Sequence, residues 1–587
     1  MKRIKTCAMS GIPRPEYPRM QFRREQSWLN LNGEWEFQPD PAKTGMQRGF
    51  FQSEQEFSQK IAVPFCMESR LSGLNIREPY AAVWYRRTVE LPEAWNGKKI
   101  LLHVGGADYL TTVWVDGCPA GRHIGGACSW TIDVTGLLQP GTAHQLTFCC
   151  EDDLTTGLQA AGKQSDRYDS YGCLFSRVTG IYGTVWLEAV APEGLASVQI
   201  VTDIADGTAT VRPDFYNFSP DCRLTVKLLK SGREADVSEC ACRPGAGVLL
   251  RDPEVRLWSP QDPFLYDLLL QVWSGDKLLD EVESYLGFRE IRISGNRILL
   301  NDKPIFLRFV LDQGYYPEGV WTAPDDAALQ RDIRLGLDSG FNGARLHQRV
   351  FEERFLYWAD RMGYLVISEC PDWRMDFLNP EACRRFNCEF REILLRDRNH
   401  PSIIAWTPLN ETYHNSVLKQ EATLPFRQFG QYDPMPNTTF YRDFVSSLHG
   451  QARMLDPTRP FHDASGGLHA DTEIWSVHYY AGNADEFKKQ LRPGEPPERH
   501  PLSVPYAGQP FLVDEFGMVD AGMDNLPDLA AQIRLMNGDP RCGGWCFTQL
   551  YDVEQEQNGL FRYDRSAKFE KDDLQAVFSE KPQWSFF

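Results

Sequence analysis

The segments SIIAWTPLNE, residues 402–411, and FLVDEFG, residues 511–517, each run from a hydrophobic strand into a glutamate. They lie in a C-terminal half where short hydrophobic runs alternate with helical patterns. Residues 325–338 and 351–362 have apolar side chains at helical spacing. These two predicted helices separate the first three hydrophobic runs from one another. Strands are predicted at residues 304–310, 341–346, 364–368, 402–407, 461–464, 474–478, 511–514 and 544–548. Eight strands in about 290 residues predict a (β/α)8 TIM barrel over residues 291–587.

The first half of the chain is rich in short β-type runs. Residues 1–190 contain many of them, separated by turn pairs such as Asn32-Gly33, which is typical of a β jelly roll. Residues 191–290 have the length and spacing of a seven-stranded immunoglobulin-like β-sandwich. The sequence therefore predicts three domains, because 587 residues are too many for one domain of about 150.

Composition argues against several classes of protein. The chain has 62 basic and 80 acidic residues, a net charge of −18, so it lacks the basic excess that nucleic acids attract. No apolar run approaches about 18 residues, the length of a membrane span, and the N-terminus lacks the apolar core of a secretion signal. The 15 scattered cysteines are an odd number and indicate free thiols in the reducing cytoplasm. We expect no nucleic-acid and no membrane partner.

Glu411 and Glu515 end two of the predicted barrel strands, and the carboxyl ends of barrel strands meet at one mouth. Two carboxylates facing one pocket suit a glycosidase, in which one is protonated to donate to the leaving oxygen and the other is ionised to attack the anomeric carbon. The alternative is that both are ordinary acidic residues. The triplet DEF at residues 514–516 occurs again at residues 485–487 without a preceding strand, so we interpret that second copy as a solvated loop or a helix start.

Seven further segments carry a resemblance to a known family. They are WLNLNGEW (28–35), VWYRR (83–87), VWVDG (113–117), GIYGTVWLE (180–188), LGFREI (286–291), FNGARLH (341–347) and GYLVISE (363–369). Each resembles a strand of glycoside hydrolase family 2, which includes β-galactosidases, β-glucuronidases and β-mannosidases. The resemblance implies a sugar-binding jelly roll, an immunoglobulin-like domain and a catalytic TIM barrel. It also implies a retaining β-glycosidase that acts on a carbohydrate or glycoside. The order of the domains lets jelly-roll loops narrow the barrel mouth, which favours exo action on terminal sugars.

The resemblance also implies roles for residues of the barrel. Glu411 would be the general acid/base and Glu515 the nucleophile. Asn410 would bind the sugar 2-hydroxyl, and Arg345 would hold the nucleophile ionised. The remaining sugar-site candidates are His347, Glu369, Trp545 and one of Tyr479 and Tyr480, with Tyr479 slightly favoured as the hydrogen-bond donor to the nucleophile. His347, Glu369 and Trp545 also have structural alternatives, as a buried histidine, an ion-pair partner and barrel core.

Two departures from the family bear on the terminal sugar. β-Glucuronidases carry an Asn-x-Lys pair after the eighth strand, which holds the substrate carboxylate, whereas this chain has Glu556 and Asn558 there. A carboxylate at this place repels a uronic acid. Large β-galactosidases have an Arg-Gly-x-Asn-Arg-His pattern in the first strand, whereas this chain places Asp312 and Gln313 there. Polar groups at this spot bind hydroxyls of the terminal sugar, so its identity stays open.

We therefore predict a β-galactosidase-like enzyme as the lead. The alternatives are a β-hexuronidase (glucuronidase or galacturonidase), a furanosidase or arabinosidase, and, from another class, a non-catalytic carbohydrate-binding protein. Hydrolysis needs only water, and the sequence has no recognisable zinc motif or dinucleotide fingerprint, so no cofactor and no metal is predicted. Because the family often forms dimers or tetramers, a homo-oligomer is also compatible with the resemblance.

Overall fold

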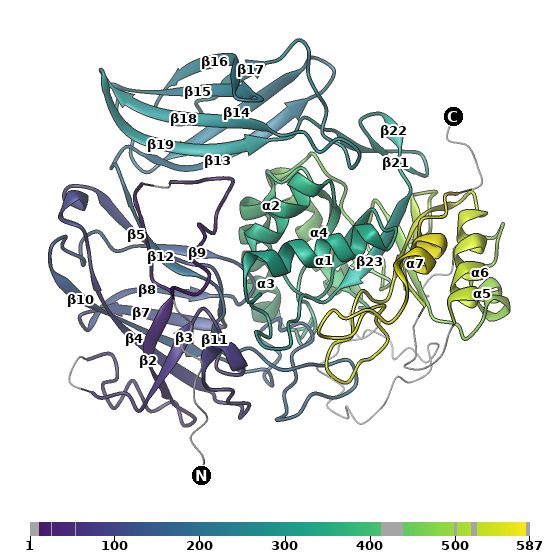
Figure 1. Cartoon of the computed structure of the whole chain (residues 1–587), viewed down its shortest axis with the longest axis horizontal. Coiled ribbons are helices and arrows are strands. Elements are labelled where there is room, and N and C mark those ends of the chain that lie inside the picture. The colour runs from purple at the N-terminus through teal and green to yellow at the C-terminus, as the bar shows by residue number, and fades with distance from the viewer. Residues whose placement is uncertain are drawn as a thin grey trace.

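The chain forms three domains around a short N-terminal segment (Figure 1). The structure, a computed structural model, describes residues 11–24, 26–52, 55–412, 438–497, 502–517 and 525–582. The N-terminal domain, an immunoglobulin-like sandwich and a barrel follow one another along the chain, as the sequence predicts. None of the helices in the described ranges has the length and apolar character needed to cross a membrane.

The N-terminal domain packs two antiparallel sheets face to face. Its elements are β1 (Trp28–Asn30), β2 (Gly33–Pro39), β3 (Gln59–Val63), η1 (Arg70–Ser72), β4 (Ala82–Glu90), η2 (Glu93–Trp95), β5 (Lys99–Val104), β6 (Ala107–Asp108), β7 (Leu110–Val115), β8 (Cys118–Ile124), β9 (Trp130–Asp133), β10 (Ala143–Glu151), β11 (Gly180–Ile181) and β12 (Val185–Val190). One sheet has the order β3-β2-β4-β10-β7-β8 and the other β1-β12-β5-β9. Buried Trp35, Phe37, Tyr85 and Phe148 belong to the core of this domain, because alternate residues of each strand face the same side.

The second domain is a seven-stranded sandwich. Its strands are β13 (Leu195–Asp203), β14 (Thr208–Phe215), β15 (Cys222–Lys230), β16 (Arg233–Ala241), β17 (Val248–Arg251), β18 (Tyr266–Ser274) and β19 (Lys277–Leu286). They form the sheets β13-β14-β17 and β16-β15-β18-β19. A small sheet of β20 (Ile291–Ser294), β21 (Arg297–Leu300) and β22 (Lys303–Pro304) then leads into the barrel.

The third domain is a barrel of parallel strands and surrounding helices. Its elements are β23 (Leu307–Asp312), α1 (Asp326–Asp338), β24 (Gly343–Leu346), α2 (Glu353–Met362), β25 (Leu365–Glu369), α3 (Pro380–Asp397), β26 (Ile403–Thr407), β27 (Leu409–Asn410), α4 (Thr438–Leu455), β28 (Ala464–Ser465), β29 (Trp475–Tyr479), α5 (Ala484–Leu491), β30 (Phe511–Phe516), α6 (Leu526–Asn537), β31 (Cys542–Phe547) and α7 (Lys571–Phe578). The sheet order is β26-β25-β24-β23-β31-β30-β29. The first strand, β23, thus pairs with the last, β31, as barrel closure requires.

The fifth barrel strand is shorter than predicted. Trp406 forms a parallel bridge with Phe461, and β27 pairs with β28, so the fourth and fifth strands meet at two separate places. Pro408 lies between β26 and β27. It has no backbone N–H to donate, which interrupts the ladder at this point. The second DEF triplet, residues 485–487, lies in the first turns of α5. Of the two forms predicted for it, a solvated loop and a helix start, it is the helix start.

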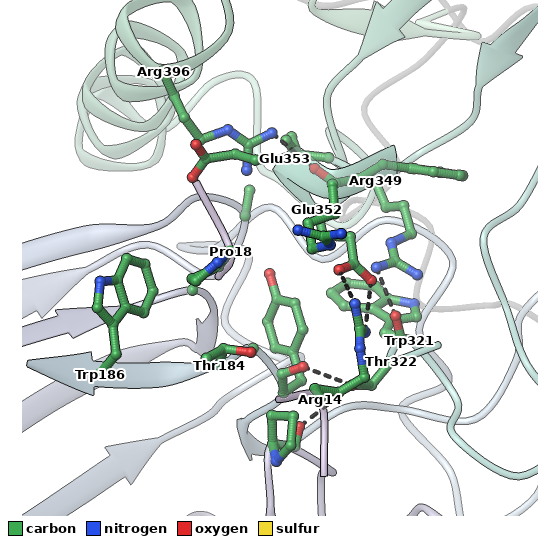
Figure 2. Close-up of a pocket in the computed structure, with 18 residues that line it drawn as sticks. Arg14, Pro18, Thr184, Trp186, Trp321, Thr322, Arg349, Glu352, Glu353 and Arg396 are labelled. Carbon is green, nitrogen blue, oxygen red and sulfur yellow. Dashed lines mark hydrogen bonds and ion pairs between the residues drawn. The ribbon is translucent and has the colours of Figure 1, made fainter. Parts of the chain in front are cut away.

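Charged side chains join the N-terminal segment to all three domains. Arg14 pairs with Glu352 of the barrel at 2.6 Å, and Arg24 pairs with Asp280 of the sandwich at 2.9 Å and with Glu188 of β12 at 3.2 Å. Figure 2 shows Arg14 and Glu352 facing each other beside a cavity of about 40 Å³ between the jelly roll and the barrel. This volume holds a few water molecules at most, so the junction is nearly closed.

Glu188 supplies a test of this junction. Its side chain is fully buried and pairs with Arg19 and Arg24, each at 3.2 Å. Burial raises the pKa of Glu188, but Arg19 and the other cations outweigh burial and hold the pKa well below its usual range. The resulting stability is present above the unfolded pKa of about 4.3 and is lost as the pH falls through the folded pKa.

We expect Glu188→Gln to destabilise the protein by about 3 kcal/mol at neutral pH, because it leaves buried arginines unpaired. Thermal unfolding would show the loss as a lower midpoint. The control is Glu34→Gln, which breaks the pair with Lys60 at side chains that are 67% and 65% exposed, and we expect it to change stability by less than about 1 kcal/mol. Equal midpoints for the two variants would contradict this account of the junction.

Candidate active site

Glu411 and Glu515 meet at the carboxyl ends of the barrel strands. Glu411 directly follows β27, and Glu515 lies in β30. One oxygen of each carboxylate and one ring nitrogen of His478 all lie within 4.8 Å of one another. Retaining glycosidases place their two carboxyl groups about 5–5.5 Å apart, whereas inverting enzymes leave about 6.5–9.5 Å for a water molecule. The separation here suits direct attack by one carboxylate.

The backbone of Glu411 is held in an uncommon conformation. Its φ angle is +50°, in the left-handed region, where a non-glycine residue is strained. The Glu411 N–H donates to the Ser465 carbonyl at 2.9 Å, which ties the turn after β27 to the fifth strand. The turn aims the Glu411 side chain at His478, whose Nδ1 lies 2.8 Å from Glu411 Oε1.

Glu515 is surrounded by groups that favour its ionised form. The Arg345 guanidinium, from β24, donates to Glu515 Oε1, and the Tyr480 hydroxyl donates to Glu515 Oε2 at 2.5 Å. Burial raises the pKa of Glu515, but the positive charges of His478 and Arg345 outweigh it and hold the pKa at about 2. Glu515 is therefore a carboxylate at neutral pH.

Arg345 is fixed from several sides. Its Nε lies 3.1 Å from Glu369 Oε2, and its Nη1 donates to the Asp514 carbonyl at 3.1 Å. Glu369 also accepts from the Gln348 N–H at 2.9 Å, and its Oε1 lies 3.1 Å from His347 Nδ1. Of the two roles predicted for Glu369, the structure shows the buried ion pair. His347 contacts the same pair, with Nδ1 2.8 Å from Arg345 Nη2.

The preference for Tyr479 over Tyr480 is wrong. Tyr480 contacts Glu515, whereas the ring of Tyr479 packs edge-on against Phe487 of α5, with centroids 6.2 Å apart. Successive side chains of a strand point to opposite faces. When Tyr480 faces the barrel interior, Tyr479 therefore faces the surrounding helices.

Trp545 is also placed differently from the prediction of a sugar-stacking ring. It is 1% exposed and packs against Phe341 and Phe516, and its Nε1 donates to Asn537 of α6 at 3.2 Å. These contacts lie between β31 and the outer helices. Trp545 is therefore barrel core, the structural alternative considered for it.

His478 is a site residue that sequence reasoning missed. Its Nδ1 lies near both carboxylates, and its Nε2 lies 2.9 Å from Ser465 Oγ. Burial lowers the pKa of His478, but Glu515 and Glu411 outweigh it, so the pKa is raised. In the sequence it is one polar residue in the run WSVHY. His478 and Tyr480 are two residues apart, which places their side chains on the same face of the strand. This spacing is the signal in the sequence that points to His478.

Several buried polar groups of the site have no partner within the described part of the chain. They are both amide atoms of Gln313, both amide atoms of Asn410, and Oε2 of Glu556. Buried polar atoms are normally hydrogen-bonded, and the hydroxyls of a sugar would satisfy these.

Asp312 and Asn558, two other candidates, have partners within the protein. Asp312 Oδ1 accepts from the Tyr551 hydroxyl at 2.5 Å and from the Gly314 N–H at 2.9 Å. Asn558 accepts from Gln549 at 2.7 Å and donates to Glu556 at 3.2 Å.

Comparisons with known proteins agree with this architecture. Models of glycosyl hydrolases family 2 match residues 29–187 as the sugar binding domain, residues 194–289, and residues 291–509 as the TIM barrel domain. The chain belongs to glycosyl hydrolase family 2. Membership makes it a glycosidase with a carbohydrate substrate and confirms the predicted fold class.

The relatives carry two different activities in their names. A β-glucuronidase of Paenibacillus borealis is 25% identical over 470 residues, which are 76% of this chain and 74% of the relative. A β-galactosidase of Thermoanaerobacter pseudethanolicus is 23% identical over 455 residues, 73% of this chain and 59% of the relative. The apo structure of a Ruminococcus gnavus β-glucuronidase superposes with a TM-score of 0.79 at 20% identity, covering 96% of this chain and all of that one. That likeness shows the fold.

The Tyr480 hydroxyl gives a direct test of the nucleophile's surroundings. We expect Tyr480→Phe to lower kcat by about 100-fold, because it removes a hydrogen bond that positions the reacting carboxylate. Tyr479→Phe is the matched control, one residue away on the other face of the strand, and we expect its kcat to stay within about threefold of the wild type. Similar losses in both variants would argue for a general packing defect in β29.

Proposed function

We propose that this chain is a retaining, exo-acting β-glycosidase in which Glu515 is the nucleophile and Glu411 the general acid/base. The observation that carries the proposal is the pair of carboxyl groups, within 4.8 Å, with Arg345 and Tyr480 holding Glu515 as the anion. An ionised carboxylate beside a second carboxyl group is the arrangement that double displacement requires.

The first step forms a glycosyl-enzyme. Glu515 attacks the anomeric carbon, while Glu411 gives its proton to the glycosidic oxygen, so the aglycone leaves as a neutral alcohol. In the second step Glu411, now a carboxylate, takes a proton from water, and the resulting hydroxide attacks the same carbon and releases Glu515. Two inversions at one carbon give overall retention. Asn410 would bind the sugar 2-hydroxyl in both steps.

His478 has a defined place in this scheme. Its Nδ1 is 2.8 Å from Glu411 and 3.4 Å from the Glu515 carboxylate. The ring therefore orients the free Glu411 carboxyl group and lies beside Glu515 before substrate arrives. Ser465 Oγ lies 2.9 Å from the other ring nitrogen and donates to Asp514 Oδ2 at 2.7 Å, so the imidazole is held through both of its nitrogens.

The lead for the terminal sugar is a β-galactoside. Glu556 and Asn558 occupy the positions at which the β-glucuronidases of the family carry their Asn-x-Lys pair. A carboxylate at this place disfavours the binding of a uronic acid. The second candidate is a β-hexuronide, which is favoured by relatives such as the P. borealis β-glucuronidase. A cytoplasmic location and a homo-oligomeric state stay predictions.

The test is hydrolysis of nitrophenyl glycosides, namely the β-galactoside, β-glucuronide, β-galacturonide, β-mannoside, β-galactofuranoside and α-arabinosides. We expect turnover of at least one, and a loss of about 1,000-fold or more in both Glu515→Gln and Glu411→Gln. Glu486→Gln is the matched control, because Glu486 belongs to the second DEF triplet and lies exposed on α5. We expect wild-type rates for that variant.

Undiminished turnover in Glu515→Gln or Glu411→Gln would contradict the assigned roles. Saturable binding of a sugar, with no product from any glycoside, would instead support the carbohydrate-binding alternative.

A further inference from the structure

A loop of the jelly roll reaches the mouth of the barrel. It is formed by residues 152–179, between β10 and β11. The Ala161 N–H donates to the Trp373 carbonyl at 2.9 Å. The next residue, Gly162, has a φ of +59°, and a Cβ there would lie 2.2 Å from the Gln348 carbonyl oxygen. Only glycine fits this position, which presses the loop backbone onto the barrel directly before Lys163.

Lys163 is a buried cation at this contact. The residue is 7% exposed, and its ammonium lies 5.3 Å from the ring centre of Trp373 and 5.8 Å from that of Phe175. Trp373 in turn donates its Nε1 hydrogen to the Asn410 carbonyl at 3.3 Å. Lys163 is thus one side chain away from Asn410 and Glu411. Within the described ranges its ammonium makes no hydrogen bond and no ion pair within 4.0 Å.

The loop that carries Glu556 is joined to the same jelly-roll loop. The Gln555 side chain donates to the carbonyls of Gly172 at 2.9 Å and Leu174 at 3.0 Å, and the Ser176 N–H donates to the Glu554 carboxylate at 3.1 Å. These bonds fix the position of Glu556 relative to Lys163. The two loops come from different domains and meet at these hydrogen bonds.

Glu556 has unused hydrogen-bonding capacity that matches Lys163. Its Oε1 accepts from Asn558, while its Oε2 is buried without a partner in the described structure. Burial lowers the pKa of Lys163, but the charge of Glu556, followed by Cys173, Glu515 and Glu411, raises it overall. In the described structure the Lys163 ammonium and the Glu556 carboxylate form no ion pair within 4.0 Å, so both keep hydrogen-bonding capacity for a ligand.

A sugar hydroxyl suits both groups, because it accepts one hydrogen bond and donates another. The ammonium offers only donors, and the carboxylate only acceptors. Their charges sum to zero, so a neutral ligand leaves the pair balanced. A uronic acid would instead place a third charge beside Glu556, which repels a second carboxylate.

We infer that Lys163 and Glu556 form a specificity pair that binds hydroxyls of a neutral terminal sugar and selects against uronic acids. The inference rests on the proposed function, whose catalytic pair lies in the same site. Under this inference the jelly roll contributes Lys163 to the sugar site, in addition to packing against the barrel.

The experiment compares β-galactoside with β-galacturonide, and β-glucoside with β-glucuronide, as nitrophenyl substrates of the full chain. The members of each pair differ only at carbon 6, where a hydroxymethyl group becomes a carboxylate. We expect the wild type to prefer the neutral member. Glu556→Gln should reduce this preference by about tenfold or more, because it removes the repelling charge. Lys163→Met should lower kcat/KM for the neutral sugar by about 10-fold to 100-fold and increase the preference.

Lys60→Met, on the edge strand β3 of the jelly roll with 65% exposure of the lysine side chain, is the control and should match the wild type. A wild type that prefers the uronide, or a preference unchanged in both Glu556→Gln and Lys163→Met, would overturn the inference.

Binding separates this outcome from failure of the proposed function. Calorimetry with Glu515→Gln protein measures affinity for galactose, glucose and their uronic acids without turnover. Stronger binding of the neutral sugars than of the uronic acids, with the affinity for the neutral sugars lowered in Lys163→Met, would uphold the pair even if no glycoside were hydrolysed. Equal affinity for neutral and acidic sugars, or no affinity for any, would overturn it, regardless of the activity of the wild type.

Discussion

The buried contact between Arg345 and Glu515 is the constraint on which the rest of the site depends. A carboxylate taken out of water is costly unless a cation accompanies it. Arg345, with no exposed surface, meets this requirement, and Glu369 and the Asp514 carbonyl hold it in place. The guanidinium is a planar fork that fixes direction as well as charge. Glu515 is therefore ionised and oriented before any substrate arrives.

The barrel explains why these groups come together from distant parts of the sequence. Arg345, Glu369, Glu411, Tyr480 and Glu515 lie in or directly after five different strands. Parallel strands bring their carboxyl ends to one edge, so residues at equivalent positions meet there regardless of their separation in the chain. The jelly roll completes the site from outside, because its long loop bonds to the backbone at Trp373 and to the loop after β31.

The sequence predicted the parts of the site that strand patterns control. Glu411 and Glu515 were recognisable because each follows a hydrophobic run, and the helix start at residues 485–487 lacked such a run. The sequence did not decide which of Tyr479 and Tyr480 contacts the nucleophile, because a shift of one residue in the strand reverses which side chain faces inward. For the same reason the sequence left Trp545 open between the sugar site and the barrel core, and the structure places it in the core.

Other features depend on contacts between segments that no local pattern records. His478 acquires its importance from Glu411 and Ser465, which lie 67 and 13 residues away. Lys163 lies in a loop of a different domain, and its position follows from the close approach of Gly162 to the Gln348 carbonyl. The fifth strand is shorter than its hydrophobic pattern predicts, because its pairing with the fourth strand is divided between the Trp406–Phe461 bridge and the β27–β28 ladder.

The most direct test of the double-displacement account is to trap the glycosyl-enzyme. A 2-deoxy-2-fluoro derivative of a turned-over glycoside, with a good leaving group, slows both steps and lets the covalent intermediate accumulate. Mass spectrometry of the intact protein, followed by peptide mapping, would then locate the sugar. The account predicts one sugar residue per chain, bound to Glu515. An adduct on another residue, or inactivation without any adduct, would contradict it.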